Sequence, residues 1–178
     1  KKQKRDPLDS RKISRSLKNG ELRALHVPEK WTQHDRGLLR VRQKMVGDQT
    51  RCRNRIKAQL YFYGVEYPEH FEHSGTHWSK RFLNWLSELD FGHASGKATL
   101  GLLLKEAIGL RELLLESNKL ILKLSQQDEY RDNVKLLLSV PGIGRLTAMT
   151  LLTELGDVTR FRGTDDLCAY LGLMPNVY

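Results

Sequence analysis

Apolar residues recur every three or four positions along most of this chain, a spacing typical of amphipathic helices. The pattern predicts helices over residues 6–19, 32–63, 76–89, 95–125, 130–138, 145–155 and 167–171. Gly or Pro residues separate most of these segments, and both residue types commonly end helices. Residues 22–31 favour an extended segment that runs into Pro28. The fold is therefore expected to be mainly α.

The most regular repeat lies in the helix predicted over 95–125. Its apolar or small residues are separated by alternating steps of four and three: Leu103, Ala107, Leu110, Leu114, Ser117, Ile121 and Leu124. A heptad seam of this kind packs against a second helix. The partner could be the helix over 32–63, in an antiparallel hairpin within the chain, or the same helix of a second copy. We favour a combination of the two.

The helix predicted over 76–89 carries Trp78, Phe82 and Trp85 on one amphipathic pattern. Aromatic side chains at helical spacing can pack in a core or stack on nucleobases. We interpret these three as core residues.

Several classes of protein find no support in the sequence. No apolar run approaches the length that spans a bilayer, and the Lys-rich N-terminus has no apolar segment behind it, unlike a secretory signal. Cys52 and Cys168 lie far apart and match no metal-binding spacing. We expect both thiols to be reduced in a cytoplasmic protein of a bacterial or archaeal cell that does not contact membranes. There is also no Walker loop, dinucleotide fingerprint or serine-hydrolase elbow.

The positive charge is concentrated in one part of the chain. The formal net charge is +9, yet residues 1–60 hold 18 Lys or Arg against 6 Asp or Glu, and residues 61–178 hold 12 against 15. Such a basic segment attracts phosphate backbones and releases their counterions. The chain is therefore expected to bind nucleic acid through cations of the helix over 32–63: Arg36, Arg40, Arg42, Lys44, Arg51, Arg53, Arg55 and Lys57.

A Pro-Gly-Ile-Gly turn at 141–144 joins two predicted helices in the pattern of a helix-hairpin-helix. Gly142 and Gly144 would let the backbone bend tightly and approach a phosphate, while Ile143 fills the core beneath. The amides at Arg145 would then donate to phosphate oxygens at a helix N-terminus, without reading sequence. The alternative is an ordinary tight corner between two packed helices.

Asp6 and Asp9 stand three positions apart at the start of the first predicted helix. Carboxylates on one helix face could help to hold a divalent ion of the Mg²⁺ type. The alternative is that one of them caps the helix. Spacing alone favours the cap, although acids amid so much positive charge are what a nuclease-like site would use.

Two blocks of sequence resemble a known family. Residues 5–17 (RDPLDSRKISRSL), with 40–46 and 54–57, resemble the end of the RuvC-like DEDD domain of insertion-sequence 110 family transposases. Residues 140–144 and 172–175, with 155–158 and Arg160-Phe161 between them, resemble the C-terminal transposase domain of that family. The resemblance covers nearly the whole chain and is least distinctive in the middle third.

The resemblance implies three segments: the C-terminal part of a RuvC-like α/β domain with the long basic helix over 1–64, a connector and coiled coil over 65–128, and a helix-hairpin-helix transposase domain over 129–178. It implies a site-specific recombinase that uses Mg²⁺, four acids and a serine nucleophile. Some members of the family are guided by a structured RNA. Asp6 and Asp9 match the last two acids and are the expected catalytic and metal-binding residues. DNA, a guide RNA and further copies joined by the coiled coil are the expected partners.

The first two acids and the nucleophilic serine of the family pattern have no match among these 178 residues. We therefore expect the chain to be an internal fragment that binds nucleic acid but does not catalyse by itself. The alternative function is a non-catalytic helix-hairpin-helix module that binds DNA or RNA.

Overall fold

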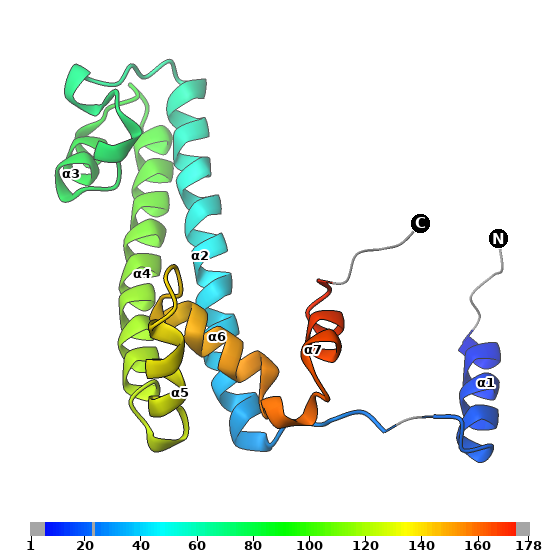
Figure 1. Ribbon diagram of the computed structural model, residues 1–178. Coiled ribbons are helices and arrows are strands. Elements are labelled where there is room, and N and C mark those ends of the chain that lie inside the picture. The colour runs from blue at the N-terminus through cyan, green and yellow to red at the C-terminus, as the bar shows by residue number, and fades with distance from the viewer. Residues whose placement is uncertain (1–5, 23, 174–178) are drawn as a thin grey trace. The chain divides into compact units, whose positions relative to one another are not determined.

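The computed structural model describes residues 6–22 and 24–173, and the chain divides into two units, Lys1–Lys30 and Trp31–Tyr178. Within these two ranges, helices account for 74% of the described residues and no strand occurs. The prediction of a mainly α fold is therefore confirmed (Figure 1).

The first unit contains one helix, α1, which spans Asp6–Lys18. Its first turn carries Asp6 and Asp9 and its last turn carries Arg15 and Lys18, an order that complements the helix dipole. The helix ends at the predicted Asn-Gly stop, where Gly20 has a φ of 68°. None of the residues of α1 is buried.

The second unit is built on two long helices that lie side by side (Figure 1): α2 spans Lys30–Phe62 and α4 spans Ala94–Leu124. Near one end, Gln59 Nε2 donates to the Gly96 carbonyl at 3.3 Å. Further along α4, Cys52 Sγ donates to the Leu103 carbonyl at 3.4 Å. Residue numbers thus fall along α2 as they rise along α4, so the pair is antiparallel.

The predicted heptad seam lies on the inner side of α4. Five of its residues are buried and the other two are half-buried: Ala107, Leu114, Ser117, Ile121 and Leu124, then Leu103 and Leu110. Of the two partners that the sequence left open, the structure shows α2 of the same chain. Pairing with a second copy stays a prediction.

The upper half of the hairpin is filled by a cluster of fully or almost fully buried side chains. It joins residues of α2, α4 and the connector between them: Cys52, Ile56, Leu60, Phe71, Phe82, Leu86, Leu100, Leu104 and Ala107. Burial raises the pKa of the Cys52 thiol above its ordinary value. Cys52 is therefore a packed core thiol.

The connector forms a cap over this end of the hairpin. It contains two 3₁₀ turns, η1 (Glu69–Phe71) and η2 (Ser74–Thr76), and the helix α3 (Lys80–Glu88). The His77 ring stacks on the rings of Tyr67 and Phe82, with centroid distances of 5.2 and 4.6 Å. The aromatic side chains pack on one another, as the sequence predicted.

The predicted start of the 76–89 helix was wrong. The helix begins at Lys80, because the Ser79 side chain accepts a hydrogen bond from the Phe82 amide and caps it. Trp78 has a φ of 67°, which a non-glycine residue adopts only when its surroundings hold it there. Its ring lies 5.0 Å from the guanidinium of Arg53, and its carbonyl accepts from Arg111 at 3.4 Å.

The lower half of the hairpin carries the C-terminal helices α5 (Asp128–Leu138), α6 (Arg145–Leu155) and α7 (Thr164–Tyr170). A second buried cluster joins α2, α4, α5 and α6: Leu39, Ile121, Leu124, Tyr130, Val134 and Met149. The last helix was predicted over 167–171, and it begins earlier, after Gly163. Asp165 and Asp166, which lie before the predicted range, occupy its first turn, where they complement the helix dipole.

Candidate nucleic-acid interface

The connection between α5 and α6 is a tight turn with the predicted Pro-Gly-Ile-Gly sequence. α5 ends at Leu138, and the amide of Ile143 donates to the Val140 carbonyl at 3.1 Å, which closes the turn. Gly142 has a φ of 88°, in a region that favours glycine. Gly144, with a φ of −88°, stands at the N-cap of α6.

The first turn of α6 has no side chain that caps it. Gly144 cannot supply one, so the amides that follow it have no acceptor from an N-cap side chain. Pro141, Gly142, Gly144 and Arg145 are all exposed. An anion that reached this turn would meet exposed backbone donors at the positive end of a helix dipole.

Beneath the turn, the two helices are firmly packed. Ala148 and Met149 are fully buried, and Ile143 is half-buried. The small Ala148 side chain therefore lies inside the packing of α6 against its neighbours. The hydroxyl of Tyr130 on α5 donates to Asp35 of α2 at 2.8 Å, which ties the pair to the long hairpin.

Two of the predicted phosphate-binding arginines contact the far end of α6. Arg36 Nε donates to the Thr153 carbonyl at 2.9 Å, and Arg40 makes two hydrogen bonds to the Glu154 carboxylate, at 2.7 and 2.8 Å. Cations at the C-terminus of a helix complement its dipole and its unpaired carbonyls. The hydrogen bonds from Arg40 hold the pKa of Glu154 below its ordinary value.

A third arginine completes this end of α6. Arg160, in the 3₁₀ turn η3 (Val158–Arg160), approaches the Leu155 carbonyl to 3.4 Å through both Nε and Nη2. Its guanidinium lies 4.1 Å from the Phe161 ring centre and 4.6 Å from that of Tyr170. These cation–π contacts attach α7 to the end of α6.

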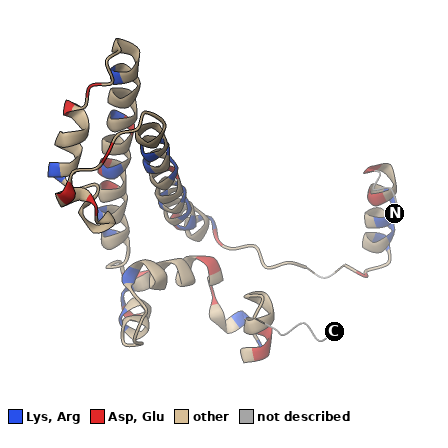
Figure 2. Cartoon of the chain, turned by 90° about the horizontal axis from the view of Figure 1, so that it is seen from above, with Lys and Arg blue, Asp and Glu red and all other residues tan. Residues whose placement is uncertain are grey.

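The other predicted cations of α2 divide into two groups. Arg42, Arg51, Arg53 and Arg55 each contact a neighbour: in order, these are Asn118, Asp48, the Trp78 ring and Glu106. Lys44 is exposed and Lys57 is half-buried. Figure 2 shows Lys and Arg recurring along the length of α2.

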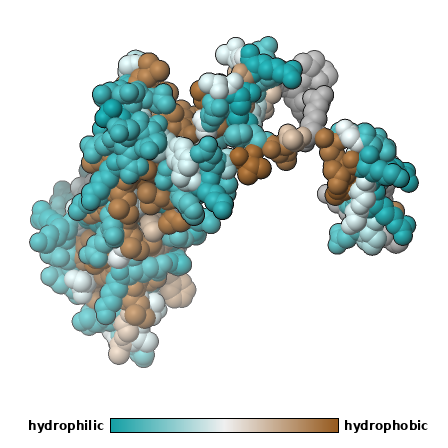
Figure 3. All heavy atoms as spheres, turned by 90° about the horizontal axis from the view of Figure 1, so that it is seen from below, coloured by the Kyte–Doolittle hydropathy of each residue, from teal (hydrophilic) through white to brown (hydrophobic). Residues whose placement is uncertain are grey.

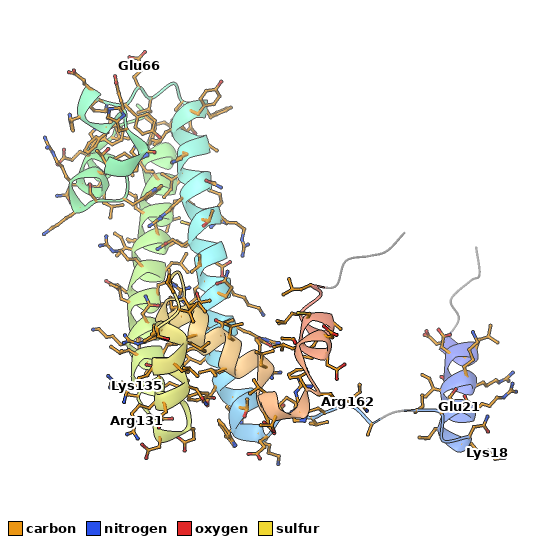
Figure 4. All side chains as sticks on the ribbon, viewed as in Figure 1. Lys18, Glu21, Glu66, Arg131, Lys135 and Arg162 are labelled. Atoms are coloured by element: carbon orange, nitrogen blue, oxygen red, sulfur yellow. The ribbon has the colours of Figure 1, made fainter. Side chains whose placement is uncertain are left out.

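Acids in other parts of the second unit neutralise local cations. On α5, Arg131 pairs with Asp128 at 2.9 Å and Lys135 with Asp132 at 3.8 Å, and both basic side chains point outward (Figure 4). Each pair lies within one helix and on its exposed side. These charges therefore add little net field beside the turn.

Asp6 and Asp9 lie together in the first turn of α1, and both are exposed. Oxygen ligands of this kind suit Mg²⁺, but two carboxylates alone make an incomplete set. Among the residues that the structure describes, no three His, Cys, Asp or Glu side chains come together as a metal-binding group.

Glu154 was not singled out from the sequence, and Arg160 was named there only as part of the family resemblance, although both shape this region. No local pattern points to Glu154, because its partners lie 114 and more positions earlier in the chain. A weak signal existed for Arg160, since it directly precedes Phe161, and neighbouring cationic and aromatic residues often stack.

Comparison with known proteins places the turn within a recognised family. Residues 134–178 match the family described as Transposase IS116/IS110/IS902, a range that begins in α5 and includes the whole turn and α6. A protein of Sinorhizobium fredii named as a putative transposase, y4qE, is 29% identical over 167 residues, which is 94% of this chain and 38% of the relative. The transposase for insertion sequence element IS1111A of Coxiella burnetii is 25% identical over 180 residues, 98% of this chain and 46% of the relative.

These matches support an IS110-family transposase. The family predicted from the motifs is thereby confirmed. The chain spans less than half the length of the two curated relatives. No solved structure matches it. Within the described residues, no helix combines the length and apolar character needed to cross a bilayer.

Proposed function

We propose that this chain is the nucleic-acid-binding part of a DNA transposase, a site-specific recombinase that moves an insertion sequence. The observation that carries the proposal is the exposed, uncapped turn at Gly142 and Gly144, in the stretch that matches the transposase family. The turn takes the backbone phosphates of DNA as a helix-hairpin-helix does, without reading sequence.

Gly144 gives the proposal its sharpest support. Its φ of −88° is open to any residue, and a Cβ placed there would meet no atom within 4 Å. Packing within the chain therefore gives no reason for glycine at this position. A phosphate approaching the amides of α6 gives one, because a side chain would stand in its way.

The cations of α2 and Arg145 supply the long-range attraction in this proposal. Lys44, Lys57 and Arg145 neutralise phosphates directly. The arginines that contact protein groups contribute charge, and those in exposed ion pairs can exchange partners at small cost. All the cations of α2 that were predicted from the sequence therefore stay in the proposed interface, although they contribute in different ways.

Catalysis is assigned to the full-length protein. We infer that Asp6 and Asp9 hold Mg²⁺ together with acids from outside these residues, because hard oxygen ligands fit that ion and two of them are too few. The ion would stabilise charge that develops during strand cleavage and exchange. The same proposal includes a structured guide RNA as a partner, further copies of the chain, and action in the cytoplasm.

The binding experiment is a pair of glycine substitutions. Gly144→Ala should leave the fold intact and weaken binding to a mixed-sequence DNA duplex several-fold, since each lost phosphate contact reduces affinity by a clear factor. Gly101→Ala is the matched control: a Cβ added to this glycine would also meet no atom within 4 Å, but the residue lies on α4, outside the turn. Equal affinities for both variants would remove the turn from the interface.

A non-catalytic helix-hairpin-helix module is the second candidate. It is favoured by the absence of a third ligand near Asp6 and Asp9 in the part of the chain that the structure describes. Asp6→Asn and Asp9→Asn in the full-length protein separate the two. Loss of Mg²⁺-dependent strand transfer, with DNA binding retained, supports the transposase; retained strand transfer excludes both acids from the active site.

A further inference from the structure

A cavity of about 180 Å³ lies between α2 and α6, beyond the turn that takes the first phosphates. Its walls include two guanidinium groups, an amide and a hydroxyl: Arg40, Arg42, Gln43 and Thr150. All four side chains can donate hydrogen bonds to an anionic oxygen. Glu154 is the single acid among the lining residues, and its carboxylate is bound to Arg40.

We propose that this cavity is a second site for a backbone phosphate, and that the Glu154 carboxylate occupies Arg40 until the phosphate displaces it. The ligand is a phosphodiester of a polynucleotide strand. The inference rests on the proposed function, because it extends the same interface from the turn along α6.

The geometry of the Arg40–Glu154 pair fits an exchange. Arg40 contacts the two carboxylate oxygens at 2.7 and 2.8 Å, which is the forked arrangement that a guanidinium also makes with phosphate. The side chains are 61% and 36% exposed. Water screens such a pair, so a ligand that offers the same acceptor geometry can replace it.

Arg36 keeps α6 attached while the carboxylate moves. It donates to the main-chain carbonyl of Thr153 at 2.9 Å, and its side chain is only 17% exposed. Arg36 also lies 3.4 Å from the Glu154 carboxylate, but its bond to the Thr153 carbonyl does not depend on that carboxylate. The helix can therefore stay in place when Arg40 changes its partner.

The cavity also lies on the path of a strand bound at the turn. Its α6 residues begin one position after Arg145 and continue through Thr150 to Glu154. Gly144 and Thr150 are six residues apart, or about 9 Å along a helix. One strand can therefore place one phosphate at the turn and another at the cavity, since its phosphates recur about every 3.4 Å of the duplex axis.

The test is Glu154→Gln in the 178-residue chain, with affinity for a mixed-sequence DNA duplex and for an RNA hairpin measured over a range of salt concentrations. We expect binding to tighten several-fold and the log–log salt slope to steepen by about 0.9, as for one more neutralised phosphate. Asp128→Asn is the matched control, because Asp128 also pairs with an arginine, Arg131, but this pair lies within α5 and outside the cavity. An equal gain in affinity in both variants would show that only the change in net charge matters, and would overturn the proposal.

A double-mutant cycle isolates the exchange. In an Arg40→Gln background, Glu154→Gln should no longer tighten binding, because the cation that it releases is missing. A gain that persists in this background contradicts the displacement. Unchanged binding by folded Glu154→Gln contradicts it as well, and leaves Glu154 a structural partner of Arg40.

The unsubstituted chain gives a readout that does not depend on variant stability. The ¹⁵N resonance of Arg40 Nε, assigned by its loss in the Arg40→Lys variant, should shift when the duplex is added, and that of Arg131 Nε on α5 should not. Inorganic phosphate alone should leave Arg40 unshifted; a shift with phosphate but none with polynucleotide would make this a free-anion site and refute the inference. Absence of salt-dependent binding to either polymer would instead refute the proposed function.

Discussion

Two connections between helices of the second unit, the cap and the turn, differ in almost every respect. The cap between α2 and α4 is long and filled with aromatic rings, and Phe82 is fully buried within it. The connection between α5 and α6 is a short, tight turn with exposed glycines. In both connections the chain turns back between two helices. The cap stabilises the hairpin by burying side chains, whereas the turn leaves its backbone uncovered for another molecule to contact.

Backbone conformation repeats this contrast. Trp78 in the cap and Gly142 in the turn both have a positive φ, of 67° and 88°. In the cap, contacts to Arg53 and Arg111 hold an unfavourable conformation in place. In the turn, glycine adopts the positive φ without the steric cost that a side chain would add. Packing compensates for strain in the cap, and the missing side chain avoids it in the turn.

The largest effect is expected in the cap. Phe82→Ala removes a fully buried ring and should lower the free energy of unfolding by roughly 3–5 kcal/mol, measured by chemical denaturation. Tyr61→Ala, at a side chain that is 89% exposed, is the control and should change it little. A small loss for Phe82→Ala would mean that the cap contributes little to the stability of the hairpin.

The next effect tests the turn. Gly142→Ala should lower the free energy of unfolding by about 1–2 kcal/mol, because a side chain at positive φ is strained even without a neighbour to clash with. No atom lies within 4 Å of the position of a Cβ there, so a larger loss would contradict the assigned conformation. Gly144→Ala, at negative φ, should not share this loss in the same denaturation experiment.

A buried tyrosine, Tyr130, and a half-buried one, Tyr67, allow the two regions to be compared at the level of one hydroxyl. Tyr130→Phe removes the hydrogen bond to Asp35 and should cost roughly 0.5–1.5 kcal/mol. Burial raises the pKa of Tyr67 in the cap as well, but Tyr67→Phe should cost less, since burial alone accounts for that shift. Equal losses would contradict the importance of the Tyr130 hydrogen bond.

The alkaline limb of the stability curve gives an independent check on Tyr130. Burial, and then the hydrogen bond to Asp35, raise the pKa of Tyr130 in the folded state well above its ordinary value of 10.0. The stabilisation is complete below that value and falls as the pH rises beyond it, because the unfolded state then loses its proton first. Tyr130→Phe should flatten this decline in denaturation midpoints measured above pH 10.0.

The smallest effect separates a cation of α2 that contacts the cap from a cation of α2 on the open surface. Lys44→Gln should reduce the salt slope of DNA binding by about 0.9. Arg53→Gln should reduce it less, because its guanidinium is already over the Trp78 ring, and partial burial lowers its pKa. An equal reduction for both would place Arg53 on the nucleic-acid surface with Lys44.

Sequence periodicity predicted the helices well because packing imposes it. The seam along α4, the glycine stop after α1 and the turn at 141–144 each have a local cause that residue spacing reveals. The start of α3 was misplaced because the Ser79 cap and the conformation of Trp78 depend on the contacts around them. Tertiary contacts overrode the local pattern there.

The candidate site was only partly predictable, for a different reason. The glycines and basic residues are visible in sequence, but nothing local shows which cations meet an acid across the fold. Arg40 and Glu154 illustrate this, since they lie 114 positions apart. The apolar side chains that remain at the surface raise the same difficulty: Figure 3 shows them as patches among hydrophilic residues, and sequence alone does not separate them from the core.

The contacts of Arg36 have a consequence for the order in which the molecule forms. Its carbonyl partners lie 117 and 118 positions later in the chain, whereas the rings of the cap come from one short stretch. Closing a long loop costs more entropy than closing a short one, and contacts of low sequence separation form first. The tip of the hairpin is therefore expected to nucleate folding, and the junction of α2 with α6 to assemble last and open first.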